Sequence, residues 1–248
     1  MIAMSLFSTG PAATSQLENG YQKVVGSEGV FATDSTNGAV LAIPNSGAHA
    51  LSVGPYSISA SEHNDRVRTY FVAAGIPADQ IGSVSVHTMV ERGGLVQDLI
   101  KPDAPQLKLV AYYSLLNRAV DGIPVADSVA WARFNAEDVV VSETVFWPEI
   151  PGQAVADAKK MALTLADPSA RAAFRAKLPV TDESEGHVVI RHSTHTWRGG
   201  FVAVASYDVN YRYPEGGGSY TRHFGLDGVE FRLPEEMVGA NIPSDPRP

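Results

Sequence analysis

The chain has 248 residues, of which 44% are hydrophobic and 19% charged, with a formal net charge of −8 and no cysteine. This length and apolar content predict one large or two small globular domains with a well-buried core. The lack of cysteine excludes disulfides, thiol catalysis and cysteine-ligated metal sites. The negative charge, without a run of Lys and Arg, argues against nucleic-acid binding.

The start of the chain carries no functional motif. Residues 1–15 lack the basic region of a secretory signal, and we interpret them as a disordered lead-in, with the removal of a signal left open. Residues 27–55 are rich in Gly, Ser, Thr and Asn, which is compatible with turns or a β-hairpin. No segment approaches the roughly 18 apolar residues of a membrane helix, so we expect no membrane span.

The first helix is predicted over residues 60–74. Ser59 and Glu62 have the spacing of a capping box, and Gly75 marks the end of the helix. Apolar residues recur at helical spacing at Val67, Tyr70, Phe71 and Ala74.

The pattern then changes to the period of β-strands, which predicts an antiparallel meander. Its second reversal contains Asp121 and Gly122, the residue types of a tight turn with positive φ, while Pro124 fits only a strand start or edge. The predicted strands span residues 84–89, 107–119, 125–135 and 139–147.

The second half repeats this order of helix and then strands. A helix is predicted to begin near Pro151, and Asp167 with Pro168 gives the N-cap of a further segment that reaches about residue 177. Asp227 and Gly228 form another turn, with Gly228 expected at positive φ. The predicted strands span residues 187–197, 201–213, 219–225 and 229–233.

The two halves share a sparse set of matching residues. Residues 110–113 align without gaps on residues 204–207, and Phe134 with its turn aligns on Phe224 with the turn before Val229. The match predicts two tandem modules, at 59–150 and 151–234. Residues 1–58 would be a lead-in with short strands, and residues 235–248 a disordered tail.

The motif Asp121-Gly122-Ile123-Pro124-Val125 and the hairpins closed by Phe134 and Phe224 resemble the PepSY and FTP modules of thermolysin-type propeptides. The resemblance implies an α+β fold of two helix-plus-antiparallel-sheet, cystatin-like repeats, separate or merged. It also implies an exported bacterial protein, secreted or periplasmic, that is non-catalytic and acts as an inhibitor-like or chaperone-like module. A monomer or homodimer bound to a protein or peptide partner is expected.

Candidate catalytic groups are weak. His187, His192 and His223 are possible metal ligands, but His192 and His195 are three apart and point to opposite faces of a regular strand. We therefore expect no metal or cofactor, and solvated or hydrogen-bonded histidines. No G-x-S-x-G elbow occurs. As a possible carboxylate pair, Glu143 and Glu149 are interpreted as exposed strand or turn positions.

Strand aromatics are the best binding candidates, because helices covering one sheet face leave others on the open face. These candidates are Tyr112, Trp131, Tyr211 and Tyr213. The sequence therefore predicts a non-enzymatic binding or regulatory module that uses the open sheet face or a sheet edge. The alternative is a small-ligand-binding protein or hydrolase with a site in a helix–sheet cavity.

Overall fold

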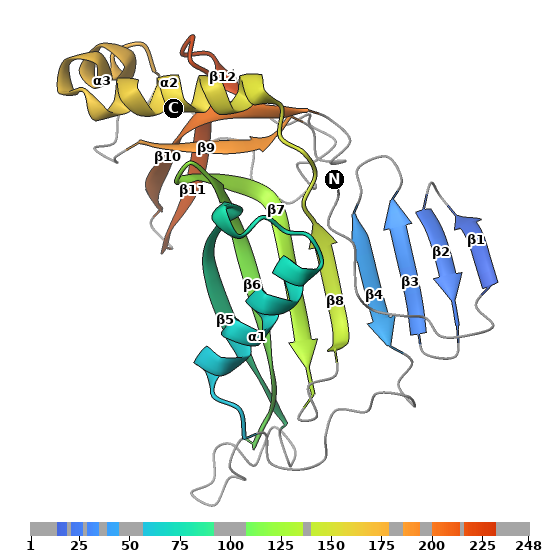
Figure 1. Ribbon diagram of the computed structural model, residues 1–248. Coiled ribbons are helices and arrows are strands. Elements are labelled where there is room, and N and C mark those ends of the chain that lie inside the picture. Colours follow the sequence, from blue (N-terminus) through green and yellow to red (C-terminus); the bar gives the residue numbers. More distant parts are fainter. Residues whose placement is uncertain are drawn as a thin grey trace, which may run out of the picture. The chain divides into compact units, whose positions relative to one another are not determined.

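The computed structural model describes residues 14–18, 21–26, 29–34, 39–44, 57–91, 108–135, 140–178, 186–193, 200–213 and 216–231. The chain divides into two compact units. Unit 1 comprises residues 1–118 and 128–149, and unit 2 comprises residues 119–127 and 150–248. Figure 1 labels the elements of both. None of the described helices is long and apolar enough to cross a membrane.

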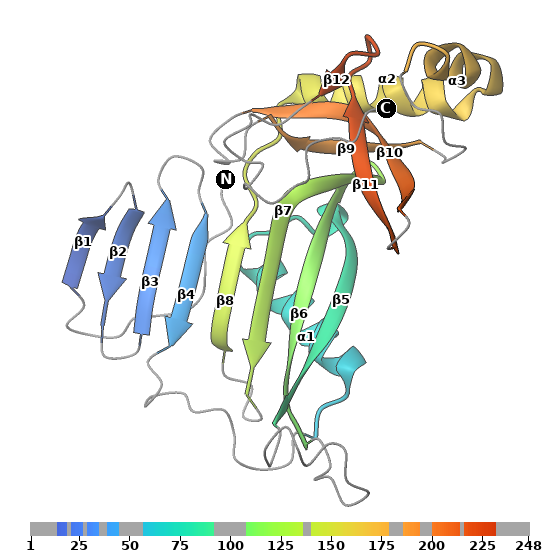
Figure 2. The same cartoon turned by 180° about the vertical axis from the view of Figure 1, so that it is seen from behind.

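Unit 1 is a sheet with one long helix on it. The strand order is β1-β2-β3-β4-β8-β7-β6-β5, and α1 (Ala60–Ala73) lies across one face of β5 to β8 (Figures 1 and 2). A short 3₁₀ helix, η1 (Ala78–Gln80), precedes β5. The strands are β1 (Thr14–Glu18), β2 (Tyr21–Val25), β3 (Gly29–Asp34), β4 (Val40–Pro44), β5 (Ile81–Glu91), β6 (Lys108–Val120), β7 (Ile123–Phe134) and β8 (Val140–Phe146).

Helix α1 is set by its N-cap residue, the glycine after its last turn and its apolar face. The Ser59 hydroxyl accepts a hydrogen bond from the Glu62 N–H at 3.1 Å, as an N-cap does. Gly75, with φ +102°, lies just past the end of the helix in a conformation that favours glycine. Val67 and Phe71 are fully buried and pack against Leu116, Ala130, Ala132, Phe134 and Val145 of the sheet and against Trp147, which follows β8. The predicted helix and its cap are confirmed.

Arg118 joins several elements of unit 1. The residue is 5% exposed. Its guanidinium donates to the Gln80 side chain at 2.7 Å and to the Pro148 carbonyl at 2.5 Å, and lies 5.1 Å from the centre of the Trp147 ring. Burial lowers the pKa of Arg118 to about 10. The five donors of a guanidinium allow one side chain to hold η1 and the end of β8 together.

Unit 2 packs two helices on a smaller sheet. α2 (Gly152–Ala166) and α3 (Pro168–Arg175) precede β9 (His187–His192), β10 (Phe201–Tyr213), β11 (Gly216–Phe224) and β12 (Glu230–Phe231). These strands are antiparallel neighbours in chain order. The first residues of β7 add a parallel contact, because Val125 pairs with Ile190 of β9.

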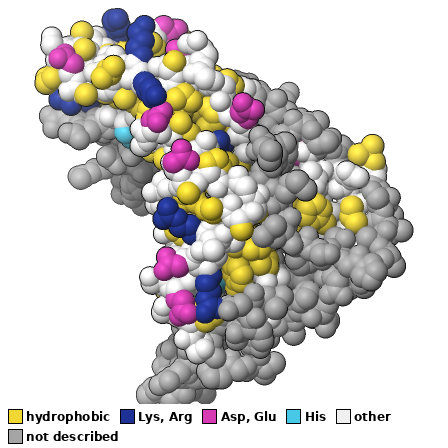
Figure 3. Space-filling view, in the orientation of Figure 1, with side chains coloured by type: hydrophobic (Ala, Val, Ile, Leu, Met, Phe, Trp, Pro, Cys, Tyr) yellow, Lys and Arg dark blue, Asp and Glu magenta, His cyan; other side chains and the backbone are white. Residues whose placement is uncertain are grey.

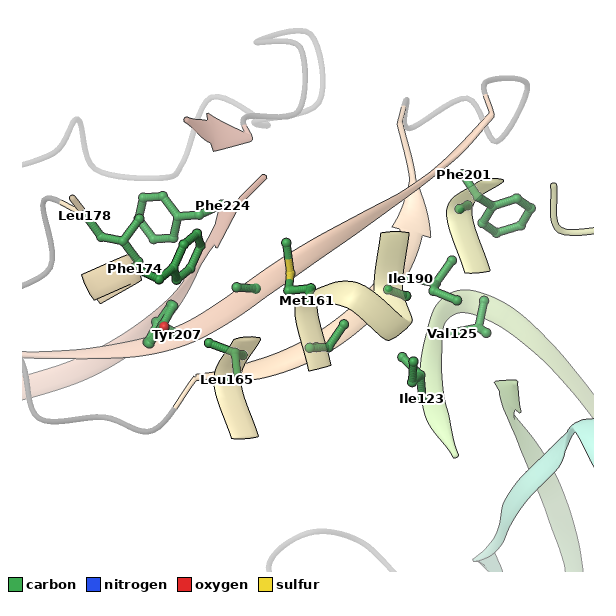
Figure 4. Packing of buried hydrophobic residues seen from close by; sticks show 14 residues of the cluster. Ile123, Val125, Met161, Leu165, Phe174, Leu178, Ile190, Phe201, Tyr207 and Phe224 are labelled. Carbon is green, nitrogen blue, oxygen red and sulfur yellow. The ribbon is translucent and has the colours of Figure 1, made fainter. Parts of the chain in front are cut away.

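The core of unit 2 lies between the helices and this sheet. Ala158, Met161 and Leu165 recur along α2 and are buried against β9 and β10. Figure 4 shows Phe174, Leu178, Tyr207 and Phe224 gathered at one end of the core, and Ile123, Val125 and Ile190 together farther along it. Asp167 accepts from the Ala170 N–H at 2.6 Å, with Pro168 as first helical residue, which confirms the predicted cap.

The predicted fold class is wrong. The structure is mostly β, with strands in a curled mixed sheet, and is not a pair of helix-plus-sheet repeats. Four strands, β1 to β4, extend the sheet of unit 1. Unit 2 instead has a second helix, a parallel strand pair and a last strand of two residues. Matching turn residues in two meanders predicted a repetition that the remaining elements do not share.

The predicted turns are confirmed. Asp121 and Gly122 have φ of +51° and +79° and join β6 to β7, as the two central residues of a type I′ turn require. Gly228 has φ +84° in the turn between β11 and β12. Pro124 is exposed in the second position of β7, close to the strand start expected for it.

Candidate binding groove

The best candidate site is a groove in unit 2 with a volume of about 770 Å³. Most of the residues that line it are apolar or glycine. This size falls in the range of about 300–1,000 Å³ that is typical of ligand sites. The groove is lined by Pro151, Gln153, Ala154, Asp157 and Lys160 near and along α2, by Phe201, Val202, Ala203 and Val204 of β10, and by Gly225, Leu226, Asp227, Val229, Glu230 and Phe231.

One wall of the groove is the first part of β10, which pairs with a strand on one side alone within the described residues. Residues 201–206 pair with β9, whereas pairing with β11 begins at Ala205, opposite Phe224. Residues 201–204 therefore form an open strand edge, and these same residues line the groove.

The hydrogen bonds of β10 fix which backbone groups face this open edge. The Ser193 N–H donates to the Gly200 carbonyl at 2.8 Å, across the β9 side. Backbone groups of successive residues alternate between the two sides of an antiparallel strand. The N–H and C=O of Val202, two residues after Gly200, therefore also point to β9. The N–H and C=O groups of Phe201 and Ala203 then point to the open edge.

The close contact between His192 and Phe201 supports this assignment of backbone groups to the two sides of β10. The two residues are register partners, and their ring centres are 4.1 Å apart. Side chains approach most closely at the antiparallel positions that exchange no hydrogen bonds with each other. Within the described sheet, the backbone N–H and C=O of Phe201 therefore form no hydrogen bond with β9 or with β11.

A tight turn keeps β11 from covering this edge. After Phe224 the chain reverses, with hydrogen bonds from Gly225 N–H to the Val229 carbonyl and from Gly228 N–H to the Gly225 carbonyl, both 2.9 Å. The Asp227 carboxylate accepts from the Val229 N–H at 3.0 Å. The turn sends the chain into β12, which pairs with β11 and not with β10.

The charges of the lining largely compensate one another. Glu230 is bonded to Arg222 at 2.7 Å. The Asp157 carboxylate accepts from the Gln153 side chain at 2.9 Å, and Lys160 lies one helical turn farther along α2. Figure 3 shows the same mixing on the face drawn, where Lys and Arg side chains lie among Asp and Glu over α2 and α3. The groove therefore favours an uncharged, apolar occupant.

Unit 1 contains a buried group of polar side chains beneath α1. The Ser114 hydroxyl donates to the Asn64 side chain at 2.6 Å, so its oxygen must accept from His63 Nδ1, also 2.6 Å away. His63 Nε2 is then the acceptor, and it receives the Phe134 N–H at 3.4 Å. Burial first, and then the charge of Arg66, lower the pKa of His63 to about 4.

This network contains the residue types of a nucleophile–base pair, but the hydrogen bond between His63 and Ser114 runs in the wrong direction. A general base must accept the proton of the hydroxyl, whereas His63 donates to Ser114. Both side chains are also fully buried. The network therefore joins α1 to β6 and β7 and supplies no activated serine.

Glu143 of β8 is fully buried, so its interpretation as an exposed strand position is wrong. Its side chain lies on the same sheet face as Val145, which packs beneath α1. Burial raises the pKa of Glu143 to about 7, against a smaller opposite effect of a hydrogen bond with Tyr70. At neutral pH a large fraction of Glu143 is therefore protonated.

The predicted aromatic residues do not lie together. Tyr112 faces α1, with its ring centre 5.7 Å from that of His63. Trp131 lies on the other sheet face, 6.0 Å from Tyr113, which stacks on exposed His87 at 4.6 Å. The side chains of Tyr211 and Tyr213 lie outside the described residues, although their backbone belongs to β10.

The three candidate histidines differ in environment. His187 is exposed, His192 is 2% exposed, and His223 is bonded to the Ser206 hydroxyl at 2.8 Å. Among the residues that the structure describes, no three His, Asp or Glu side chains are placed to share a metal ion. His195 lies outside them.

The groove itself was not predicted. The sequence predicts a strand that contains Phe201 and Ala203 and a helix that contains Ala154, but no functional role for these residues. No local pattern shows that the neighbouring strand, β11, ends before it reaches residues 201–204. Comparisons of the chain with protein-family models, with curated protein sequences and with solved structures find no match.

Proposed function

We propose that this protein is a non-enzymatic binding module that holds an extended polypeptide segment along the open edge of β10. The observation that carries this proposal is that residues 201–204, which form the open edge, also line the groove. Phe201 and Ala203 each offer an N–H and a C=O beside an apolar hollow of about 770 Å³. Addition of a strand gives such groups their hydrogen bonds, while the hollow receives side chains.

Buried polar groups elsewhere do not favour catalysis. His63 and Ser114 are fully buried and bonded in the wrong direction, and Glu143 lies in the core of unit 1. The resemblance to PepSY and FTP modules remains a hypothesis that agrees with a binding role. Secretion and a partner in the cell envelope remain predictions of that resemblance.

The test is selection of binding peptides from a phage-displayed library of random 12-residue sequences, followed by affinity measurement with the synthetic peptides. Ala203→Pro removes an N–H that faces the open edge and no bond to β9, so the fold should survive. We expect at least a tenfold loss of peptide affinity. Val202→Pro is the matched control, because it removes a bond to β9 and should lower the melting temperature.

Hydrogen exchange gives a readout on the unchanged protein. Bound peptide should slow exchange of the Phe201 and Ala203 amides, which lack partners in the described sheet. Equal affinity for wild type and Ala203→Pro, or unaltered exchange at both amides, would contradict the proposal. A small apolar ligand that occupies the groove without protecting these amides would favour the alternative function, a small-ligand-binding protein.

A further inference from the structure

We infer that the bound segment carries apolar side chains at two alternate positions, i and i+2, which enter the groove against α2, while the residue between them is unrestricted by that helix. This inference rests on the proposed function and specifies its partner. Its basis is the direction of the side chains along the open edge.

Phe201 and Ala203 direct their side chains toward α2. Both belong to the core formed with α2 residues such as Ala158 and Met161, in which Phe201 is 9% exposed and Ala203 partly buried. Residues directly opposite each other in a pair of strands share a face of the sheet. Segment residues opposite Phe201 and Ala203 must therefore also point toward α2, whereas the residue opposite Val202 points away.

Small side chains leave the space that these residues would fill. Ala154 of α2 and Ala203 of β10 both line the groove, and each presents a single methyl group. Leu226, Val229 and Phe231 supply further apolar surface to the same groove, and Val229 is 65% exposed. A bound apolar side chain would remove part of this surface from water, at about 25 cal/mol per Å².

The charges of the lining argue against a charged side chain at these two positions. Glu230 is paired with Arg222 at 2.7 Å, and the Asp227 carboxylate is occupied by the Val229 N–H. A buried charge from the segment would lose its hydration without a free counter-charge from either of these groups. Lys160 is the cation of the lining, but it is exposed, and an ion pair with an exposed lysine contributes little. Apolar alternation is therefore the pattern that the groove recognises.

The test is an aspartate scan of a selected peptide, measured by fluorescence polarisation against the full chain. We expect at least a tenfold loss of affinity at two positions that are two residues apart, and less than a twofold change at the position between them. Loss at adjacent positions, or equal loss throughout, would overturn the inference. If Ala203→Pro still abolished binding, the proposed function would stand while the inference failed.

Ala203→Val provides a second test at the same residue. It keeps the N–H of the open edge and fills the hollow, so it should weaken peptides with a large side chain at one of the two positions and spare those with alanine there. Ala156→Val, on an exposed α2 position outside the groove, is the control. Equal affinities for all peptides, or a concentration-dependent dimer abolished by Ala203→Pro, would contradict the inferred partner.

Discussion

His63 on α1 and Ser114 on β6 form a buried hydrogen bond of 2.6 Å across 51 residues of sequence. The onward bond from Ser114 to Asn64 leaves His63 as the donor, with its other nitrogen accepting from the Phe134 N–H. Protonation of His63 would place a second donor opposite that N–H. The network therefore requires the neutral imidazole.

This requirement predicts a pH dependence that His63→Asn removes. The pKa of His63 falls from 6.5 to about 4 on folding, so its contribution is full above pH 6.5 and is lost as the pH falls toward 4. Between pH 7 and pH 5 the loss amounts to about 2 kcal/mol. Urea unfolding should show that, on acidification over this range, His63→Asn gains stability relative to wild type. A constant difference would contradict a neutral, buried His63.

Glu143 should have the opposite effect. Its pKa rises from 4.5 to about 7 on folding, so its contribution is full below pH 4.5 and is lost as the pH rises through 7. Glu143→Gln should therefore gain about 2 kcal/mol relative to wild type between pH 5 and pH 7. Between pH 5 and pH 7 the contributions of His63 and Glu143 to the stability of wild type change by similar amounts in opposite directions and cancel. Each single variant should therefore show the pH dependence that the remaining residue causes. Parallel curves for wild type and Glu143→Gln would be inconsistent with a buried, protonated carboxyl.

Gly228→Val should destabilise the protein by more than about 1 kcal/mol. The cause is φ of +84°, since an added Cβ would meet Lys177 and Leu178 at no less than 3.6 Å, an ordinary contact. Gly200→Val is the control, because its Cβ would meet nothing within 4 Å and its φ lies outside the left-handed region. Thermal melts of the two variants should separate, and equal melts would contradict backbone strain.

His192 and His187 should respond differently to replacement by Gln, although the sequence predicts solvated or hydrogen-bonded histidines at both positions. His192 is 2% exposed and contacts Phe201, so His192→Gln should cost about 1–3 kcal/mol as a buried packing change. His187→Gln, at an exposed position, should stay within about 0.5 kcal/mol. Denaturant titrations test both, and a neutral His192→Gln would show that its packing contributes little.

Elemental analysis tests the expected lack of a metal ion. The purified protein should contain no stoichiometric zinc, and a chelator should leave its melting temperature unchanged. Bound zinc at one equivalent, or a sharp fall in melting temperature with the chelator, would contradict this expectation, since metal binding contributes directly to folding free energy.

Local chemistry allowed much of the secondary structure to be predicted. Ser59 and Asp167 cap helices, and Gly122 and Gly228 adopt positive φ, because each requirement involves residues near in sequence. The parallel pairing of Val125 with Ile190 could not be predicted, because it depends on long-range packing. The assumption of repeats made the fold class wrong.

The candidate site was less predictable still. Its open edge arises because β11 ends opposite Ala205 while β10 begins four residues earlier, at Phe201. Strand lengths on both sides decide this difference, and neither is encoded at Phe201 or Ala203. The burial of His63 and Glu143 similarly depends on which sheet face α1 covers.

The short open edge also affects solubility. Unpaired strand edges can template aggregation, and natural proteins restrain this by keeping such edges short. Residues 201–204 offer outward backbone groups at Phe201 and Ala203 alone, since pairing with β11 begins at Ala205. Backbone bonds at two residues are too few to hold an arbitrary strand, so this edge should not start fibrils unless the turn at Gly228 is lost and β11 detaches from β10.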